Sequence, residues 1–383
     1  MSFPTRFYER NGTIMKPQYP EYDHSLLSLI SSILTHYGVQ TPHKTLPELD
    51  SLLAKSYKNI VVMLFDGMGT AILENHLPPD AFLRRHLNTT LSSVFPPTTT
   101  AATVSLESGL SPIEHAWLGW SLYFEELDAN VNLFPNTLSG TDGKPAADFS
   151  IARKTLPYTS VFTKIDQAGL AKAYRISPYS SFQSKSISEI CDTVQKLCAQ
   201  EGRQYLYTYW PQPDYDMHDH GTQHPKITGV LSEINTLTER MCRQLSDTLV
   251  IITADHGLVD TTWRFLSDYP ELTACFARAP SIETRAMTFF IKPDRKAQFE
   301  KLFRASFGDC FQLFTKEEVL LSNLFGNGTP HIRAKDFIGD YLAVATGTVS
   351  IDPGERTDEV FKAAHAGLTD EELNVPFITV ECK

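Results

Sequence analysis

The sequence predicts an α/β protein with a mostly parallel central sheet that is flanked by helices. Two observations lead to this prediction. Apolar runs without internal polar alternation recur along the chain and end in acidic residues, and amphipathic helical patterns lie between them. A strand that is buried on both faces has such a continuous apolar run. Helices that alternate with buried strands are typical of parallel sheets.

The first expected elements are a helix and a buried strand. A helix is expected over 22–38, because apolar side chains recur there on one helical stripe and Gly38 closes the pattern. The apolar run within 58–69 is expected to be a strand that ends at Asp66. This order begins the alternation of helix and strand.

The same order recurs twice in the middle of the chain. A helical pattern at 187–202 leads into an apolar run at 203–210, which ends in a polar segment at 211–221. A second helical pattern at 229–246 leads into the run at 247–257, which ends in "TADHG". We therefore expect two further strands of the same sheet.

The pattern changes between residues 270 and 347, where the predicted elements are shorter. This change predicts a small α+β cap insertion at 270–347 and a catalytic core formed by 1–269 and 348–383. A run at 339–346 is expected to lead back to the main sheet. The other elements expected in the insertion are a strand at 285–293, a helix at 294–308, a strand at 310–315 and a helix at 316–326.

Composition limits the classes of partner. The 383 residues are 42% hydrophobic and 21% charged, which is ordinary for a soluble globular protein, and the formal net charge is −11. That negative charge argues against a nucleic-acid polymer or an anionic membrane as the main partner. No apolar run approaches ~20 residues, and no secretory signal is visible. The six scattered cysteines form no CxxC pair, so we expect a cytoplasmic protein with reduced thiols.

Acidic residues follow three of the expected strands: Asp66, Asp214 and Asp255. Ligands of open α/β sheets bind beyond the carboxyl ends of the strands, so these side chains are expected to converge. His218 stands four residues after Asp214, a spacing that lets both face one ion, and His256 directly follows Asp255. The strand ends therefore predict a metal centre.

The candidate ligands form two chemical groups once His365 is added. Mixed imidazole and carboxylate ligands suit Zn²⁺, with Mn²⁺ or iron as alternatives. Two such ions about 3.5–4 Å apart clamp a phosphoryl group. The first group is Asp214, His218 and His365, and the second is Asp66, Asp255 and His256 with a threonine oxygen. The histidines at 220 and 224 show that a polar loop also supplies such residue types without being a site.

Three successive threonines at 98–100 follow two prolines in "SSVFPPTTTAATVSLESG". A threonine hydroxyl is a poor nucleophile at neutral pH, but coordination to a dication lowers its pKa. A helix N-terminus adds N–H groups and the positive end of the helix dipole for a phosphate. We therefore expect a helix start that also presents an attacking hydroxyl, although the residue types alone do not say which threonine it is.

Five sequence blocks together resemble the alkaline phosphatase superfamily. Within it, the chain is most similar to the type I phosphodiesterase/nucleotide pyrophosphatase family, over roughly residues 57–260 and 335–383. This resemblance implies an alkaline-phosphatase-like core. The blocks are "LFDGMG", "SVFPPTTTAATVSLESGLSPIEHAWLGW", "PDYDMHDHG", "TADHG" and "HAGLTDEELNVP".

The resemblance also implies roles for individual residues. The family's nucleophile stands ten residues before the glycine of a "TGL"-like turn; here that glycine is Gly109, so the resemblance implies Thr99, with Thr98 as a cap. It further implies zinc at both sites, a phospho-threonine intermediate and attack by water in the second step. The implied ligands are Asp66, Thr99, Asp255 and His256 for one metal and Asp214, His218 and His365 for the other.

Several functions remain open at this point. The first is hydrolysis of a small phosphodiester or nucleotide pyrophosphate. The alternatives are a phosphomonoesterase, phosphonate hydrolase or phosphomutase of the same superfamily, and a non-catalytic metal-binding protein. No Cys or Ser in a C-x-P-x-R setting indicates a sulfatase, and only about 115 residues separate Thr99 from Asp214, which argues against a cofactor-independent phosphoglycerate mutase.

The sequence does not identify the group that the substrate carries besides the reacting phosphate. Ala102 stands where a family motif carries an asparagine, which leaves nucleotide specificity open. Trp117, Trp120 and Tyr123 are candidates for stacking on a base by position, although packing roles are favoured for them. The oligomeric state is equally unreadable.

Overall fold

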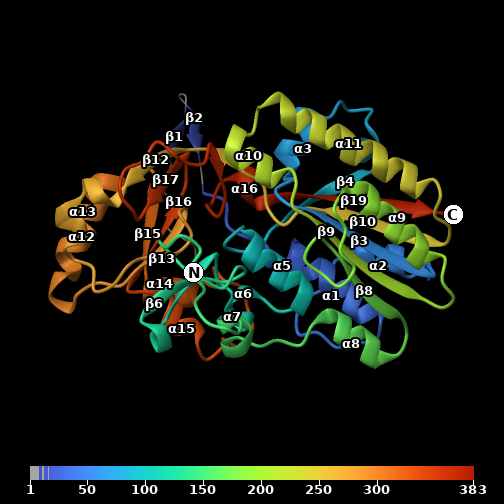
Figure 1. Cartoon of the computed structure of the whole chain (residues 1–383), viewed down its shortest axis with the longest axis horizontal. Helices are drawn as coiled ribbons and strands as arrows, with labels where there is room; N and C mark the ends of the chain where they lie inside the picture. The colour runs from blue at the N-terminus through green and yellow to red at the C-terminus, as the bar shows by residue number, and fades with distance from the viewer. Residues whose placement is uncertain (1–7, 11–12, 16) are drawn as a thin grey trace.

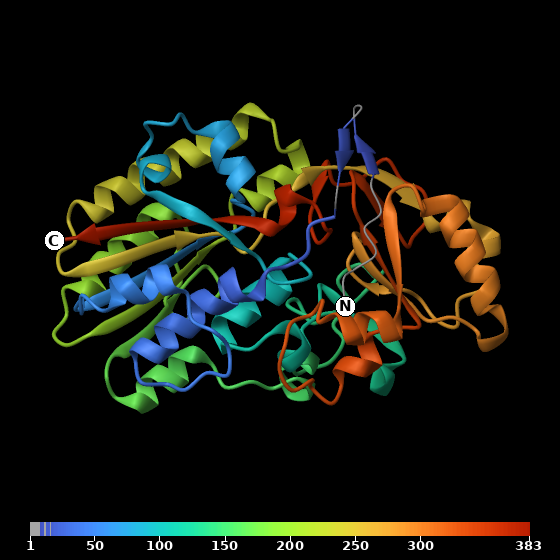
Figure 2. The same cartoon turned by 180° about the vertical axis from the view of Figure 1, so that it is seen from behind.

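The structure, a computed structural model, describes residues 8–10, 13–15 and 17–383. A main sheet with helices on both faces forms one end of the molecule, and a second sheet forms the other end (Figure 1). The C-terminus lies at the outer edge of the half that contains the main sheet, as the reverse view also shows (Figure 2). Among the described residues, no helix combines the length and the apolar character that crossing a membrane would need.

The main sheet has six strands, which lie in the order β4-β19-β10-β3-β9-β8. The last four strands of this order run parallel to one another, whereas β19 is antiparallel to both of its neighbours. The predicted mostly parallel sheet is therefore confirmed. In chain order its strands are β3 (Asn59–Phe65), β4 (Leu87–Ser92), β8 (Lys172–Ile176), β9 (Gln204–Trp210), β10 (Thr248–Thr253) and β19 (Asn374–Cys382).

Helices cover both faces of this sheet, which confirms the predicted flanking layers (Figure 1). The central strands β3 and β10 are buried along their whole length, as their continuous apolar runs require. One set of helices comprises α1 (Leu26–His36), α2 (Pro47–Leu53), α5 (Thr99–Ser108) and α8 (Val161–Ala168), and the other comprises α3 (Thr70–His76), α4 (Phe82–Arg85), α9 (Ile187–Cys198) and α11 (Pro225–Cys242).

The second sheet has seven strands in the order β15-β16-β14-β13-β5-β6-β7. The expectation that 339–346 leads back to the main sheet is wrong, because β16 pairs with β14 and β15. The C-terminal strand that enters the main sheet is β19, which had no prediction. The strands are β5 (Ser121–Phe124), β6 (Ala129–Asn132), β7 (Thr137–Leu138), β13 (Ser281–Ile282), β14 (Ala286–Phe289), β15 (Phe311–Thr315) and β16 (Tyr341–Ala345).

The second sheet also takes strands from outside the predicted insertion. Strands β5 to β7 belong to 121–138, far before residue 270 in the chain, and β5 pairs with β13. The division into a core of 1–269 and 348–383 and a cap of 270–347 stays a prediction, since sheet membership alone does not delimit a domain. Sequence could not foresee this pairing because it joins residues about 160 positions apart.

The remaining elements are short or lie at the edges of the two sheets. All six cysteines are free and buried. The elements are β1 (Tyr8–Arg10), β2 (Thr13–Met15), α6 (Pro112–His115), α7 (Ile151–Thr155), α10 (Asp214–His220), β11 (Val259–Asp260), β12 (Thr262–Phe265), α12 (Pro270–Thr273), α13 (Lys296–Phe307), α14 (Lys316–Ser322), α15 (Ala334–Phe337), β17 (Val349–Asp352), β18 (Ala363–Ala364) and α16 (Asp370–Leu373), with 3₁₀ turns at Tyr22–His24, Glu125–Leu127, Leu266–Asp268 and Pro293–Arg295.

Candidate active site

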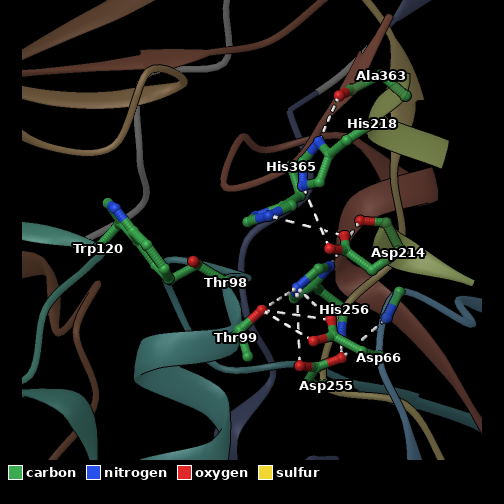
Figure 3. A network of polar contacts seen from close by, with 12 residues as sticks. Asp66, Thr98, Thr99, Trp120, Asp214, His218, Asp255, His256, Ala363 and His365 are labelled. Carbon is green, nitrogen blue, oxygen red and sulfur yellow. Dashed lines mark hydrogen bonds and ion pairs between the residues drawn. The ribbon is translucent and has the colours of Figure 1, made fainter. Parts of the chain in front are cut away.

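The carboxyl ends of three adjacent parallel strands bring the predicted acidic residues together (Figure 3). Asp66 directly follows β3, Asp214 begins α10 shortly after β9, and Asp255 lies two residues after β10. The strands are neighbours in the sheet and run in the same direction, so their ends meet at one edge. The three carboxylates thus lie close together although the chain separates them widely.

Asp66, Asp255 and His256 form the first group. Each can offer a donor atom within 4.8 Å of the other two, and all three side chains are buried. The Oδ1 atom of Asp255 accepts from the backbone N–H of Gly67 (3.1 Å) and of His256 (3.0 Å). Its Oδ2 atom is buried without a hydrogen-bond partner among the described residues. This oxygen is therefore available for a cation.

His256 is oriented by its backbone contact. Its Nδ1 atom lies 3.1 Å from the carbonyl oxygen of Gly257, which favours a proton on Nδ1. The Nε2 atom then carries the lone pair and faces Asp66 at 3.4 Å. A neutral imidazole held in this way is the usual form of a metal-ligating histidine.

The structure separates the three threonines by their surroundings. Thr99 is the first residue of α5, and its Oγ1 lies 3.1 Å from His256 Nε2 and 3.3 Å from Asp66 Oδ1 (Figure 3). Thr98 occupies the N-cap position, but its hydroxyl donates to Glu283 at 2.7 Å and makes no capping bond. The Thr100 hydroxyl is buried without a partner among the described residues. Of the three, Thr99 faces the first group.

Asp214, His218 and His365 form the second group, again with donor atoms within 4.8 Å of one another. One turn of α10 separates Asp214 from His218, and His218 Nε2 lies 3.2 Å from Asp214 Oδ2. The Nδ1 atom of His218 lies 2.8 Å from the carbonyl oxygen of Ala363, which orients this ring in the same manner as that of His256. His365 Nε2 approaches Asp214 Oδ1 at 3.9 Å.

The two groups are parts of one site. The rings of His256 and His365 stack with their centroids 3.9 Å apart, so that a member of each group contacts the other. His220 and His224 instead stack on each other at 4.8 Å, and neither belongs to a candidate metal group among the described residues. The structure thus gathers the seven predicted side chains and leaves out the two histidines of the polar loop.

The electrostatics of the first group reflect buried negative charge. Burial, together with the charges of Asp255 and Asp214, raises the pKa of Asp66 well above its usual value. Burial also raises the pKa of Asp255. Carboxylates that are buried this close to one another resist joint ionisation unless positive charge is supplied.

In the second group, the pKa of the carboxylate shifts in the opposite direction and is lowered. Burial favours the neutral acid, but the neighbouring His218 outweighs it and lowers the pKa of Asp214. Burial, reinforced by the proximity of His256, lowers the pKa of His365 well below its usual value. A neutral His365 keeps a lone pair for a cation.

The residues present fit divalent cations. Asp214 Oδ1 and Asp255 Oδ2 are buried without hydrogen-bond partners among the described residues, and each belongs to a different group. Buried polar atoms are normally paired, so two unpaired carboxylate oxygens at one site indicate a ligand. The mixed imidazole and carboxylate donors are those that zinc and similar ions take in catalytic centres.

Gly67 permits the close approach of the strand ends. Its φ is +72°, and a Cβ atom there would lie 2.8 Å from the Cβ of Asp214. Only glycine adopts this conformation without strain while leaving room for the neighbouring chain. The "DGMG" turn after β3 is therefore required for Asp66 and Asp214 to meet.

A buried ion pair positions the segment that carries His365. Arg285 and Glu372 are both fully buried and form two bonds, Nε to Oε1 (2.6 Å) and an Nη2 atom to Oε2 (2.8 Å). Glu372 also accepts from the backbone N–H of Gly367 (2.7 Å) and from the Thr369 hydroxyl (2.7 Å). These bonds constrain the chain directly after His365.

A cavity of about 800 Å³ opens beside the two groups and is lined by Thr99, Asp214, His218 and His365. Glu283 also lines it, a residue that the sequence analysis missed. Its Oε1 atom accepts from Thr98 Oγ1 (2.7 Å) and from the backbone N–H of Trp120 (2.7 Å). Burial raises the pKa of Glu283 to about 7. No motif marks this residue, because it lies in the turn between β13 and β14 of the second sheet and reaches the site only through folding.

The three aromatic candidates have different environments. Trp117 is buried and donates from its indole N–H to the Leu156 carbonyl at 3.0 Å, which makes it a packing residue. The side chain of Tyr123 lies under the Arg278 guanidinium, 3.6 Å from the ring centroid. Trp120 is 43% exposed and lines the cavity (Figure 3). Of the three, Trp120 is the one that can contact a substrate.

Comparisons with known proteins bear on the family and the fold of the chain. Residues 60–302 match the family model described as type I phosphodiesterase / nucleotide pyrophosphatase. No curated protein sequence matches the chain.

Among solved structures, the fold resembles murine ectonucleotide pyrophosphatase/phosphodiesterase 5 at a TM-score of 0.63 and 16% identity, covering 84% of this chain and 88% of that one. The human protein of the same name gives a TM-score of 0.61 at 15% identity, with 84% and 87% coverage. An inactive variant of the murine protein, in which a threonine is replaced by alanine, was solved in complex with AMP and gives 0.62 at 16% identity, with 84% and 87% coverage.

Proposed function

Because the chain belongs to the type I phosphodiesterase / nucleotide pyrophosphatase family, we propose that it hydrolyses a small phosphodiester or nucleotide pyrophosphate with Thr99 as the nucleophile. The family assignment makes the protein a metal-dependent hydrolase of the phosphodiesterase class. The observation that carries the proposal for Thr99 is the position of its hydroxyl, 3.1 Å from His256 Nε2 at the first turn of α5.

The proposed reaction has two displacement steps. In the first, the Thr99 oxygen attacks phosphorus, the bond from phosphorus to the departing oxygen breaks, and that oxygen leaves as an alcohol or phosphate after taking up a proton. The Thr99 hydroxyl lies 3.1 Å from His256 Nε2 and 3.3 Å from Asp66 Oδ1, and these two groups are the acceptors within reach of the hydroxyl proton. In the second step, water attacks the phospho-threonine, which releases the phosphate monoester and restores the Thr99 hydroxyl.

The proposed cofactors are two divalent metal ions, with zinc preferred and manganese as the alternative. Asp66, Asp255 and His256 together with Thr99 would hold one ion, and Asp214, His218 and His365 would hold the other. Bound cations of this kind supply Lewis acidity, which lowers the pKa of a hydroxyl and stabilises charge on a phosphoryl group. The backbone carbonyls of Gly257 and Ala363 keep the two histidine rings turned towards these positions.

Two further features support the proposal. The first N–H groups of α5 have no partner within the helix and point towards the Thr99 end, where an anionic phosphoryl group would lie. In the murine relative, replacement of a threonine gives an inactive protein that binds AMP. Both features are consistent with a threonine nucleophile and with a nucleotide or similar phosphoester as the substrate.

A pair of aromatic esters tests the proposal. We expect turnover of bis-p-nitrophenyl phosphate to exceed that of p-nitrophenyl phosphate in kcat/KM. The reverse order would favour a phosphomonoesterase, and activity on phosphonate esters alone would favour a phosphonate hydrolase. Retained metal without turnover of any ester would show a non-catalytic metal-binding protein. The cytoplasmic location stays a prediction.

A further inference from the structure

A second cavity, of about 520 Å³, is separate from the candidate active site. It is lined by the last turn of α5, by the segment from α7 to the first turn of α8, and by β8, and we call it the α7–α8 cavity. It shares no lining residue with the cavity beside the two donor groups. Glu107, its residue on α5, follows Thr99 by two helical turns, which is about 12 Å along the helix axis.

The charged groups of this lining carry an excess of positive charge. They are the guanidinium groups of Arg153 and Arg175 and the carboxylate of Glu107. Since the whole chain has a formal net charge of −11, the positive excess is local to this hollow. A hollow lined by charge of one sign concentrates ligands of the opposite sign. The α7–α8 cavity therefore favours anions.

The donor groups of the two arginines are only partly used within the chain. Arg175 Nη2 lies 2.8 Å from Glu107 Oε1, while the Arg175 side chain remains 32% exposed and its Nε atom is buried without a hydrogen-bond partner among the described residues. Arg153 is exposed and forms no ion pair with any residue that the structure describes. Because buried polar atoms are normally paired, an unpaired guanidinium nitrogen next to a second unpaired cation indicates an anionic ligand.

Glu107 holds Arg175 in place at this cavity. Its side chain is 8% exposed, and its Oε2 atom accepts from the Tyr158 hydroxyl at 3.4 Å. Burial raises the pKa of Glu107, and the charges of Arg175 and Arg153 oppose that rise, which shows that both cations lie near this carboxylate. An arginine side chain that a buried carboxylate already orders loses less conformational entropy when it binds a ligand.

The uncharged part of the lining suits an organic group beside the anion. Tyr158 and Phe162 supply aromatic surface, and the hydroxyls of Ser160 and Thr163 lie 3.0 Å apart at the first turn of α8. The positive end of the α8 dipole lies at the same turn and adds to the attraction for an anion. A volume of about 520 Å³ falls within the range of small-molecule sites, roughly 300–1,000 Å³.

We propose that the α7–α8 cavity binds a phosphate monoester that carries an aromatic or heteroaromatic group. Its dianionic phosphate binds the guanidinium groups of Arg153 and Arg175, and its ring contacts Phe162. Guanidinium groups suit this anion because they form charge-assisted, often bidentate hydrogen bonds with phosphate oxygens. The site takes no part in the proposed reaction, so the inference goes beyond the proposed function and does not depend on it.

Equilibrium dialysis of the metal-loaded full chain with phenylphosphonate at pH 8 tests the inference. This probe is a dianion with an aromatic ring and has no ester bond to hydrolyse. Because metal ions at the candidate active site also attract a phosphonate, we expect about two equivalents to bind per chain, one at each site. Benzenesulfonate has a similar shape with one negative charge fewer, and we expect it to bind the α7–α8 cavity on the order of tenfold more weakly.

Matched variants assign each binding event to its site. Arg153→Gln removes a cation from the lining, whereas Lys154→Gln removes the neighbouring cation of the same exposed helix, which lies outside the lining. We expect Arg153→Gln to weaken one event by on the order of tenfold and Lys154→Gln to change neither. Arg153→Lys keeps the charge without the planar fork and is expected to recover part of the loss. His365→Asn is expected to weaken only the other event.

The results distinguish the α7–α8 cavity from the metal centre. A single equivalent that is lost in His365→Asn and kept in Arg153→Gln would place all binding at the metal centre and overturn the inference. Equal effects of Arg153→Gln and Lys154→Gln, equal affinities for the two probes, or no binding at millimolar concentration would also overturn it. A single equivalent that is lost in Arg153→Gln and kept in His365→Asn would support it. Failure of the proposed function shows in ester turnover and leaves this measurement unaffected.

Discussion

Arg285 and Glu372 form a fully buried ion pair that joins the second sheet to the segment carrying His365. Arg285 directly precedes β14, and Glu372 lies in α16 beside the C-terminal strand of the main sheet. Arg285 also donates to the carbonyl oxygens of Gly347 and Val349, at 2.7 and 3.0 Å. The active-site edge thus depends on a contact between the two sheets.

Glu372→Ala is expected to destabilise the fold by about 3–5 kcal/mol, because the buried Arg285 guanidinium would lose its partner. Loss of the bonds to Gly367 and Thr369 is also expected to reduce bound metal, since His365 lies in the same segment. Urea unfolding and metal analysis measure the two effects. Glu300→Ala is the control, because its pair with Arg304 is partly exposed and is worth less than about 1 kcal/mol. Similar losses in both variants would contradict the assigned importance of the buried pair.

Thr99→Ala is expected to lower kcat on a phosphodiester by at least about 10³-fold while leaving the metal content nearly intact, because the carboxylates and imidazoles remain. Thr100→Val is the matched control. The Thr100 hydroxyl is buried without a partner among the described residues, so its replacement by an isosteric methyl should preserve activity and stability. An active Thr99→Ala enzyme together with an inactive Thr100→Val or Thr98→Ala enzyme would move the nucleophile to another threonine.

His365→Asn is expected to remove about one equivalent of bound metal per chain, because the second group would retain only Asp214 and His218. Metal analysis of the purified variant measures this loss. His220→Asn changes a histidine of the polar loop that lies outside both groups, and its metal content should match that of the unmodified protein. Unchanged stoichiometry in His365→Asn would exclude this residue from the site.

Removal of metal by EDTA is expected to abolish activity, and added Zn²⁺ or Mn²⁺ is expected to restore it. Activity that survives exhaustive chelation would contradict metal-dependent catalysis. A second readout is the pH dependence of the stability of the chelated protein, which reports on Asp66.

In the chelated protein, the folded-state pKa of Asp66 is raised above its ordinary value of 3.8 by burial and by the neighbouring carboxylates. The folded state then holds a proton that the unfolded state releases, so this contribution to stability is fully present below pH 3.8 and is lost as pH rises through the raised pKa. The Asp66→Asn variant lacks this pH-dependent loss of stability, because an amide does not titrate in this range. Its Tm is therefore expected to exceed that of the chelated unmodified protein by on the order of 3 °C at pH 8 and to approach it near pH 4. A constant difference across this range would show that Asp66 does not titrate in this way.

The sequence by itself determined the parts of the molecule that depend on local pattern. Continuous apolar runs at β3, β9 and β10 predicted buried parallel strands, since a strand covered on both faces excludes polar residues. Parallel strands share one edge, and from this rule alone Asp66, Asp214 and Asp255 were expected to lie together. Spacing also predicted that His218 would join Asp214, because one helical turn separates them.

The tertiary structure decided what depends on pairing between distant segments. Strands β16 and β19 are both rich in apolar residues, and only their partners show that β19 enters the main sheet whereas β16 joins the second sheet. Glu283 and the ion pair of Arg285 with Glu372 had no sequence signal, because Glu283 and Thr98 are 185 positions apart in the chain and Arg285 and Glu372 are 87 apart. Residue types likewise left three threonines open until the fold placed Thr99 against His256. Periodicity records which face of an element is buried, but not which element will cover it.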